Sequence, residues 1–297
     1  MPRNVITDAD IVIPADVPKA MHATFIKNYQ ALTKNTGRFF VFACDQKMEH
    51  LNQDFFGSNV HPDALHPTHI FKIAQNTEVG CLATHPGLIA RYAQEYTGIN
   101  YVAKLNGKSP LVPLEQQDPL SKALWSVDQV VHWAQCANIP VRGIGYTLYL
   151  GSEFENNMLQ EAAQIIYNAH QHGLVTILWI YVRGKAIQND QDGMITAGAC
   201  GFANSLGADV VKVKPPLGDV EKTSTEWLAV AAQAAGNTKV ICAGGSVMNI
   251  KLFLQQLNDQ IKKGHASGCA TGRNIFQRSY TDAVNACKAI AEIVYEK

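Results

Sequence analysis

Residues 172–184 read HGLVTILWIYVRG, and residues 207–216 read GADVVKVKPP. Each run follows a glycine that suits a helix C-terminus, is rich in apolar and β-branched residues, and meets lysine or arginine only towards its end. Near-continuous apolar runs of this length are typical of parallel strands that are buried on both faces. The two stretches therefore predict neighbouring strands of an α/β fold.

Six further runs of the same kind bring the number of predicted strands to eight, at residues 38–45, 79–84, 100–105, 140–149, 174–182, 208–214, 239–243 and 266–271. Segments with helical spacing lie between or after them, at residues 127–138, 153–172, 195–206, 224–235, 249–263 and 280–295. Eight alternating units close most economically into a (β/α)₈ TIM barrel. An open doubly wound sheet is the alternative, which periodicity alone does not exclude.

Residues 1–36 precede the first predicted strand and contain a predicted helix over residues 18–34. Since this segment is too short for a core of its own, we expect an N-terminal extension that packs on a single barrel domain of residues 37–297. The first residues, MPRNVITDADIVIPADV, lack the apolar core of a signal peptide, and no apolar run is long enough to span a bilayer. We expect a soluble, cytoplasmic protein.

The composition excludes several classes of function. Twenty-five basic and 25 acidic residues give a formal net charge of zero, which argues against nucleic acid or an anionic membrane as a partner. The seven cysteines are scattered and form no CxxC pair, which argues against a disulfide framework and a zinc knuckle. An anionic substrate must therefore be held by a local cluster of basic groups.

Lys212 and Lys214 are the first candidates for catalysis. They lie two residues apart on a predicted strand and so share one face, opposite to Val211 and Val213. Burial and a like-charged neighbour both favour a neutral amine, which is a nucleophile that forms a Schiff base with a carbonyl. The alternative is that both lysines reach solvent at the strand end or pair with carboxylates such as Asp45.

The neighbouring strand places Trp179, Tyr181 and Arg183 on one face by the same alternation. A tyrosine beside a Schiff-base lysine can carry a proton to and from a substrate hydroxyl. An arginine suits a phosphate or carboxylate through bidentate hydrogen bonds. The alternatives are packing inside the barrel for Trp179 and a structural ion pair for Arg183.

The last two predicted strands lead into glycine-containing turns that precede helices. A phosphate site is expected from residues in these two turns, namely Gly244, Gly245, Ser246, Gly272 and Arg273. Barrel enzymes often bind phosphate at this place through backbone N–H groups. Either glycine group alone is weak support, because glycine also serves tight turns.

Two further polar residues lie on predicted strands one and three. Asp45 closes strand one, with Glu49 and His50 just beyond, and is expected to bind substrate hydroxyls or a lysine ammonium; a helix cap is the alternative. Lys104 on strand three is the main rival of Lys212 as the reactive lysine, and spacing does not eliminate it. If it is not the reactive lysine, Lys104 is expected to contact the substrate.

Metal and cofactor chemistry find little support. His61, His66 and His69 lie close together, but their segment is rich in proline and no cysteine or carboxylate set completes a zinc site. A solvated loop is expected there. Residues 143–151, GIGYTLYLG, lack the glycine spacing of a dinucleotide fingerprint. We therefore expect neither a metal nor another cofactor.

Seven motifs taken together resemble a known family. They are DQKMEH (45–50), VAKLNGKSP (102–110), YTLYLGSEFE (146–155), HGLVTILWIYVRG (172–184), GADVVKVK (207–214), AGGS (243–246) and TGRNIFQR (271–278). In this order, they resemble the archaeal-type class I fructose-1,6-bisphosphate aldolases of the DeoC/LacD-like superfamily. The resemblance runs from about residue 38 to the C-terminus, and the order of the motifs makes it more specific than any one of them.

The resemblance implies a TIM barrel that reversibly cleaves fructose 1,6-bisphosphate to dihydroxyacetone phosphate and glyceraldehyde 3-phosphate, without metal. It implies that Lys212, the first lysine of the lysine-x-lysine motif, forms the Schiff base and that Lys214 supports it. Tyr181, which lies between Trp179 and Arg183 on its strand, would carry the proton to and from the substrate. Asp45 would orient the substrate, and a phosphate would be bound by Gly244, Gly245, Gly272 and Arg273.

One departure concerns the mouth of strand one. The family usually has a glycine between its aspartate and its glutamate–histidine pair, whereas Gln46, Lys47 and Met48 stand here. Lys47 is a candidate for contact with a second phosphate.

Two alternative functions stay open. One is a lysine-dependent transferase, either a phosphorylated-diketone thiolase or a transaldolase-like synthase, and the other is a non-catalytic phosphosugar-binding protein. The resemblance also implies a homo-oligomer, such as a decamer.

Overall fold

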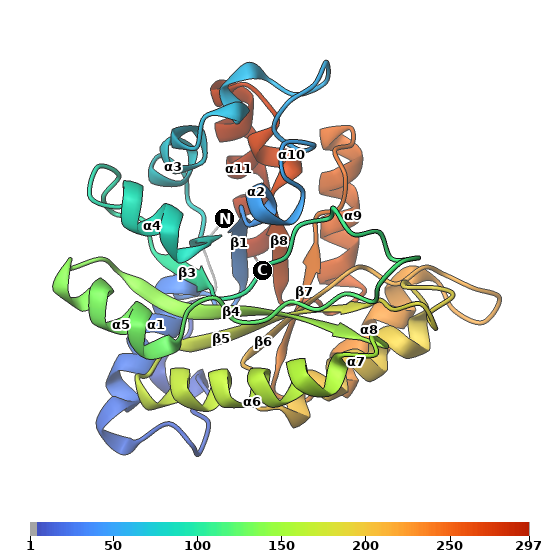
Figure 1. Ribbon diagram of the computed structural model, residues 1–297, viewed down its shortest axis with the longest axis horizontal. Helices are drawn as coiled ribbons and strands as arrows, with labels where there is room; N and C mark the ends of the chain where they lie inside the picture. The colour runs from blue at the N-terminus through green and yellow to red at the C-terminus, as the bar shows by residue number, and fades with distance from the viewer. Residues whose placement is uncertain (1–4, 297) are drawn as a thin grey trace.

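The computed structural model describes residues 5–296 of the 297-residue chain. Eight parallel strands form a closed barrel in sequence order (Figure 1). Their bounds are β1 Phe39–Ala43, β2 Cys81–Thr84, β3 Tyr101–Lys104, β4 Val141–Leu150, β5 Val175–Val182, β6 Val210–Val213, β7 Lys239–Ala243 and β8 Gly268–Thr271. Because β1 pairs with β8, the sheet has no edge. The predicted (β/α)₈ barrel is confirmed, and the open sheet is wrong.

Helices surround the barrel as the chain alternates between the two element types. The longer ones are α1 His22–Thr33, α3 Thr68–Gln75, α4 Pro86–Tyr92, α5 Val127–Cys136, α6 Glu155–Gln171, α7 Gly193–Ser205, α8 Ser224–Ala234, α9 Ile250–Lys262 and α11 Tyr280–Tyr295. Short elements are α2 Gln46–Glu49, α10 Arg273–Phe276 and the 3₁₀ helices η1 Asp8–Asp10, η2 Lys19–Met21 and η3 Pro62–Leu65. Gly173 and Gly207 follow α6 and α7 with φ of +63° and +85°, where glycine is favoured.

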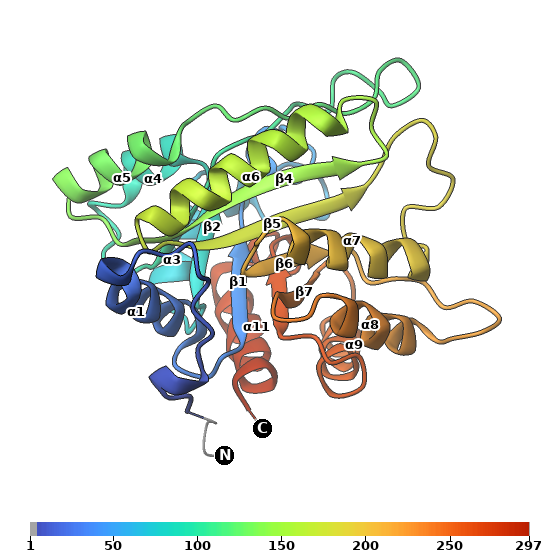
Figure 2. The same ribbon diagram turned by 90° about the horizontal axis from the view of Figure 1, so that it is seen from below.

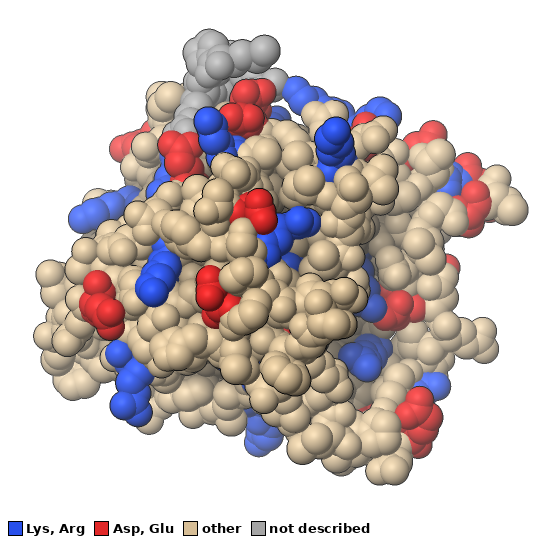
Figure 3. Space-filling view, turned by 90° about the horizontal axis from the view of Figure 1, so that it is seen from above, with Lys and Arg blue, Asp and Glu red and all other residues tan. Residues whose placement is uncertain are grey.

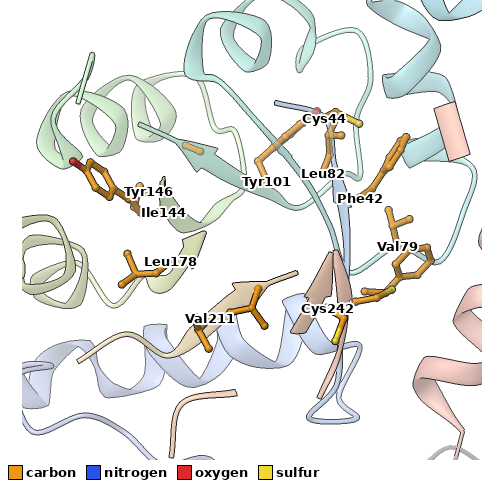
Figure 4. Packing of buried hydrophobic residues seen from close by; sticks show 14 of the residues in the cluster. Phe42, Cys44, Val79, Leu82, Tyr101, Ile144, Tyr146, Leu178, Val211 and Cys242 are labelled. Atoms are coloured by element: carbon orange, nitrogen blue, oxygen red, sulfur yellow. The ribbon is translucent and has the colours of Figure 1, made fainter. Parts of the chain in front are cut away.

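The alternation of side chains along the strands divides the core into two layers. Outward-facing residues pack against the helices, as Figure 4 shows for Phe42, Leu82 and Tyr101. Inward-facing residues form a second cluster that fills the barrel from its N-terminal end, including Val41, Val102, Val175, Ile177, Val210 and Ile241. The inward face becomes polar only at the C-terminal ends of the strands, which leaves that end for the site.

The N-terminal extension closes the other end of the barrel. Phe25, Tyr29 and Leu32 of α1 belong to the same buried cluster as the inward-facing strand residues. Figure 2 shows α1 beside the tails of the β4 and β5 arrows, away from their heads. His170 on α6 links the extension to the barrel. One of its ring nitrogens lies 2.9 Å from Asp16 of the extension, and the other lies 3.2 Å from Asp209, which directly precedes β6. Substrate access is therefore restricted to the C-terminal end.

The surface carries no single dominant charge on the face shown in Figure 3, where basic and acidic side chains are interspersed. All seven cysteines are free, and all but Cys136 are buried. Across residues 5–296, no helix combines the length and the apolar character that a membrane span needs.

Candidate active site

A cavity of about 490 Å³ opens at the C-terminal ends of the strands. Its walls come from several βα loops, so residues far apart in the sequence meet there. Predicted site residues in the lining are Asp45, Tyr181, Arg183, Lys212, Lys214, Gly244, Gly245, Gly272 and Arg273. The volume falls in the usual range for small-molecule sites. The structure thus brings together residues that sequence reasoning had selected one strand at a time.

Lys212 lies at the base of the cavity. Its Cα pairs with that of Trp179 across β5 and β6, and its Nζ lies 5.4 Å from the centroid of the Trp179 ring. The residue is only 4% exposed. Burial lowers the pKa of the Lys212 amine to about 8, with the cations Lys104 and Arg273 acting in the same direction and Asp45 opposing them. A substantial share of the amine is therefore neutral near neutral pH.

Lys104 is the opposite kind of lysine. Its side chain is fully buried, and its Nζ lies 3.0 Å from Asp45 Oδ2 and 3.3 Å from Glu49 Oε1. Burial acts against its charged form, but the two carboxylates outweigh burial and raise the pKa of Lys104. Lys104 is absent from the cavity lining, which differs from the predicted contact with substrate. It is a permanent cation behind the wall, at 5.5 Å from the Trp179 centroid.

Asp45 stands between the two lysines. Burial opposes its ionisation, but Lys104 and Lys212 together hold the pKa of this carboxyl far below its ordinary value. Asp45 precedes the short helix α2 without capping it through its side chain, so the cap alternative does not describe it. The carboxylate is ionised, lines the cavity and can accept hydrogen bonds from substrate hydroxyls.

Two tyrosines from adjacent strands face each other at the cavity wall. The rings of Tyr181 on β5 and Tyr149 on β4 stack with centroids 6.1 Å apart, and Tyr149 Oη lies 3.4 Å from Glu49 Oε2. Burial and the charge of Asp45 raise the pKa of Tyr181 above its ordinary value. In the free protein, Tyr181 is therefore a protonated phenol. Tyr149 and its contact to Glu49 were not among the predicted site residues.

Lys214 does not share the environment of Lys212. It lies beyond the end of β6, its side chain is 42% exposed, and it forms an ion pair with Asp190. Lys214 therefore fits the alternative of a lysine that reaches the strand end and pairs with a carboxylate, since β6 ends at Val213. Lys214 still borders the cavity, at its rim.

Trp179 and Arg183 lie below and above the tyrosine on β5. Trp179 is fully buried and absent from the cavity lining, so it packs beneath the two lysines instead of presenting a surface to substrate. Arg183 follows the last residue of β5 and borders the cavity, and no carboxylate among residues 5–296 lies within 4.0 Å of its guanidinium. The ion-pair alternative therefore does not hold for Arg183.

The turns after β7 and β8 form one wall of the cavity. Gly245 has φ of +67°, where glycine is favoured, and a Cβ at Gly272 would lie 2.2 Å from the carbonyl oxygen of Ala43, which leaves no room for a side chain at that position. Asn274 fixes the first turn by donating from Nδ2 to the carbonyls of Gly244 and Ser246, at 2.8 Å and 3.1 Å. Ser246 is exposed and does not line the cavity, which differs from its predicted place in the phosphate site.

Two other predictions about the first loops need correction. Lys47 points away from the cavity, because its Nζ donates to the carbonyl of Leu65 at 3.0 Å and lies 3.8 Å from the centroid of the Phe55 ring. The segment with His61, His66 and His69 is not a simple loop but contains η3 and the start of α3. His69 is buried there, with Nε2 3.1 Å from the carbonyl oxygen of Phe276.

Sequence reasoning also missed a strap formed by residues 105–126, which crosses the barrel between β3 and α5 (Figure 1). Residues of its first half line the cavity, namely Lys108, Pro110, Val112, Pro113 and Leu114. Its second half is fastened to the barrel, since Ser152 Oγ donates to the carbonyl of Pro119 and Asp118 accepts from two backbone amides. The strap has no helical or strand periodicity. Lys108 in the motif VAKLNGKSP was the only sequence signal that this segment takes part in the site.

The sequence model of the DeoC/LacD family aldolases matches residues 39–278, which is the whole barrel from β1 to the turn after α10. The chain belongs to this family. This DeoC/LacD aldolase is 44% identical over 287 residues to the Methanocaldococcus jannaschii protein named fructose-bisphosphate aldolase/6-deoxy-5-ketofructose 1-phosphate synthase, with 97% of this chain and 91% of the relative covered. It is 32% identical over 275 residues to the class 1 fructose-bisphosphate aldolase of Thermoproteus tenax, covering 92% and 95%.

Solved structures agree with this placement of the DeoC/LacD aldolase. The fructose-bisphosphate aldolase from Slackia heliotrinireducens superposes with a TM-score of 0.96 at 49% identity, covering 98% of this chain and 92% of that one. An archaeal fructose-1,6-bisphosphate aldolase, whose catalytic lysine is bound to the carbinolamine intermediate, superposes with a TM-score of 0.78 at 29% identity, covering 91% and 99%. The chain is thus a member of the class 1, Schiff-base fructose-bisphosphate aldolases, which are lyases.

Proposed function

We propose that this aldolase reversibly cleaves fructose 1,6-bisphosphate to dihydroxyacetone phosphate and glyceraldehyde 3-phosphate through a Schiff base on Lys212. The observation that carries the proposal is the state of the Lys212 amine. It is buried at the base of the cavity with its pKa lowered to about 8, whereas Lys104 is sealed between two carboxylates and Lys214 is paired at the rim. Of these three lysines, only Lys212 combines access with nucleophilicity.

Imine formation follows from these protonation states. The neutral amine of Lys212 attacks the C2 carbonyl carbon of the open-chain ketose and gives a carbinolamine. The phenol of Tyr181 donates its proton to the departing hydroxyl, so water leaves and a protonated imine remains beside a phenolate. The new fixed cation at Lys212 favours that phenolate, since an opposite charge close by lowers a pKa.

Carbon–carbon cleavage uses the same proton carrier. The Tyr181 phenolate takes the proton of the C4 hydroxyl, the C3–C4 bond breaks, and its electron pair moves into the imine to form an enamine. Glyceraldehyde 3-phosphate leaves. Tyr181 returns the proton to C3 and water hydrolyses the imine, restoring the phenol and freeing dihydroxyacetone phosphate and Lys212. Tyr181 suits this role because it lies two residues beyond Trp179, the strand partner of Lys212, on the same face of β5.

Binding groups surround this centre. Asp45 accepts hydrogen bonds from the hydroxyls of the ketose, which its low pKa permits throughout the physiological range. Gly244, Gly245 and Gly272 leave room for a phosphate to approach the backbone, and Arg273 supplies a charge at the same wall. We assign the phosphate on C1, next to the reacting carbonyl, to this wall.

A second candidate reaction joins the same three-carbon enamine to another aldehyde, as in the transaldolase-like alternative. The name of the M. jannaschii relative includes 6-deoxy-5-ketofructose 1-phosphate synthase, which supports this candidate. C6 of that product is a methyl group, so the aldehyde that supplies C4 to C6 carries no phosphate. Both reactions share Lys212 and differ only in what occupies the far end of the cavity.

Borohydride trapping tests the proposal. The wild type, Lys212→Met and the surface control Lys288→Met are incubated with dihydroxyacetone phosphate, EDTA and borohydride, and peptide mass spectrometry locates the adduct. We expect an adduct on Lys212 in the wild type and the control, none in Lys212→Met, and cleavage of fructose 1,6-bisphosphate that EDTA leaves unchanged. An adduct on Lys104 or Lys214, or activity abolished by EDTA, would overturn the assignment. Preference for 2-oxopropanal over glyceraldehyde 3-phosphate as acceptor would favour the second candidate.

A further inference from the structure

Another cavity lies at the N-terminal end of the barrel, away from the candidate active site. It has a volume of about 410 Å³ and is enclosed by α1, α5, the start of β4 and the residues that join α6 to β5. Figures 1 and 2 show α1 and α5 at the tails of the β4 and β5 arrows. The volume falls in the usual range for small-molecule sites, and the two cavities share no lining residue.

The titratable residues that line this N-terminal cavity are all basic. They are Lys27 on α1, Arg142 on β4 and His172 after α6, and the described lining includes no aspartate or glutamate. His172 has a partner outside the lining, since its Nε2 lies 2.8 Å from Asp128 Oδ1. Across residues 5–296, no carboxylate oxygen lies within 4.0 Å of Lys27 or Arg142. The cavity therefore holds two cations without an acidic partner in the described part of the chain.

Arg142 is held in place by amide side chains. Its Nε donates to Asn100 Oδ1 at 3.2 Å, and its Nη1 donates to Asn28 Oδ1 at 3.3 Å. Asn28 is buried and is fixed in turn, because its Nδ2 donates to the carbonyl of Gly173 at 2.8 Å. A guanidinium has five N–H groups, so three remain on Arg142, two of them on Nη2. They suffice for a bidentate contact with a phosphate or a carboxylate.

Burial makes the charge of Arg142 costly. The residue is half-buried, and burial lowers the pKa of its guanidinium. Arg38, half-buried at the same end of the barrel, has a better partner, since its Nη1 donates at 2.8 Å to the carbonyl of Glu296 at the C-terminal end of α11. The end of a helix carries partial negative charge, which stabilises a cation. Among residues 5–296, Arg142 bonds only to neutral amides, so an anion in the cavity would replace the hydration that burial removes.

The N-terminal cavity is shared between the extension and the barrel. Helix α1 contributes Lys27 and Asn28, and β4 contributes Arg142. Gly173 brings the two parts close together, because a Cβ there would lie 3.0 Å from the carbonyl oxygen of Met21. The walls are thus fixed before a ligand arrives, which lowers the entropy lost on binding. An anion that contacts both Lys27 and Arg142 would connect the extension to the barrel.

From these contacts, we infer that the cavity between α1, α5 and β4 binds a small organic anion, either a phosphate ester or a polycarboxylic acid, through Arg142 and Lys27. Both kinds of ligand offer the same chemistry, which is a group of negatively charged oxygens that accept from a guanidinium and an ammonium. The inference is independent of the proposed function, because this cavity lies at the opposite end of the barrel from the active site. Binding there would stabilise the extension against the barrel.

Hydrogen exchange followed by mass spectrometry tests the site. The wild type is compared in inorganic phosphate, in propane-1,2,3-tricarboxylate and in sodium chloride of equal ionic strength. We expect slower exchange over residues 22–33, 131–142 and 171–175 in at least one of the first two solutions. Protection by phosphate alone would support a phosphate ester, and protection by the tricarboxylate alone would support a polycarboxylic acid. Protection by neither, equal protection by chloride, or protection confined to residues 243–246 and 271–274 of the active site would overturn the inference.

Calorimetry with the protecting anion then assigns the residues. Arg142→Met and Lys27→Met are compared with Arg38→Met, another half-buried arginine, and Lys19→Met, an exposed lysine of the extension, neither of which lines the cavity. We expect a loss of affinity of about tenfold or more in Arg142→Met, about two- to fivefold in the more exposed Lys27→Met, and none in the controls. Unchanged affinity in both cavity variants, or equal losses in the controls, would overturn the site. Lys27→Met keeps the test decisive if a thermal melt shows that Arg142→Met does not fold.

Discussion

Replacement of Lys104 by methionine is expected to raise the pKa of Lys212. The Nζ atoms of the two lysines lie 5.5 Å and 5.4 Å from the same Trp179 ring centroid, so they are at most about 11 Å apart. At that distance, with an effective dielectric constant of about 20, two unit charges repel by about 1.5 kcal/mol. This corresponds to about one pKa unit, and a shorter separation would give more.

The consequence is a loss of neutral amine near neutral pH. With the pKa of Lys212 at about 8, roughly a quarter of the amine is neutral at a pH of about 7.5. A rise of about one unit leaves roughly 3% neutral, so imine formation should slow about eightfold at that pH and recover in more alkaline buffer.

The assay measures how fast the borohydride-trapped adduct forms on Lys212 in a single turnover, as a function of pH. It compares the wild type, Lys104→Met and Lys104→Arg. The arginine variant keeps the cation and should keep the midpoint near that of the wild type. Lys104→Met leaves the buried Asp45 and the partly buried Glu49 without their partner, so its stability should fall by about 3–5 kcal/mol, and the rates are measured below its melting temperature. A midpoint that stays in place or falls in Lys104→Met, or that shifts as far in Lys104→Arg, would refute the electrostatic role of Lys104.

Three further predictions concern the proton carrier, the cavity wall and the base of the barrel. Tyr181→Phe should still give the borohydride adduct on Lys212, but more slowly, because the proton donor for loss of water is gone, and it should lose about 10²–10⁴-fold in cleavage rate, measured by coupled assay; unchanged cleavage would remove Tyr181 from the mechanism. Gly272→Ala should lower the free energy of unfolding by about 1–3 kcal/mol in urea, because its Cβ would lie 2.2 Å from a β1 carbonyl oxygen, whereas Gly198→Ala, with open space around it on α7, should be neutral or stabilising. Burial disfavours the charged form of His170, but its two aspartates outweigh burial and raise its pKa, so its stabilising effect is full below the unfolded-state value and is lost as pH rises through the folded-state value. The difference in melting temperature between wild type and His170→Gln should accordingly shrink with rising pH, and a constant difference would contradict this linkage.

The elements that could be predicted were those with a strong local pattern. Strand β7 and helix α11 have the predicted bounds, 239–243 and 280–295, because their apolar periodicity is uninterrupted. Helices α3 and α4 were missed because each begins at or directly after a proline and is short, so that its periodicity covers about two turns. The strap was missed because its conformation is set by Asn106, Asp118 and other contacts from distant segments, with no period of its own.

The sequence by itself determined the alternation of strands and helices and the side chains that share a strand face, because the period of two residues along a strand is a local property. That was enough to make Lys212, Tyr181 and Asp45 candidates, and the family resemblance implied their roles. Only the tertiary structure decided which lysine has which charge. Lys104, Lys212 and Lys214 look alike along the chain, but one lies between two carboxylates, one is buried beside cations, and one is paired at the rim. Charge state depends on desolvation and on neighbours brought from other strands, and neither is encoded in spacing.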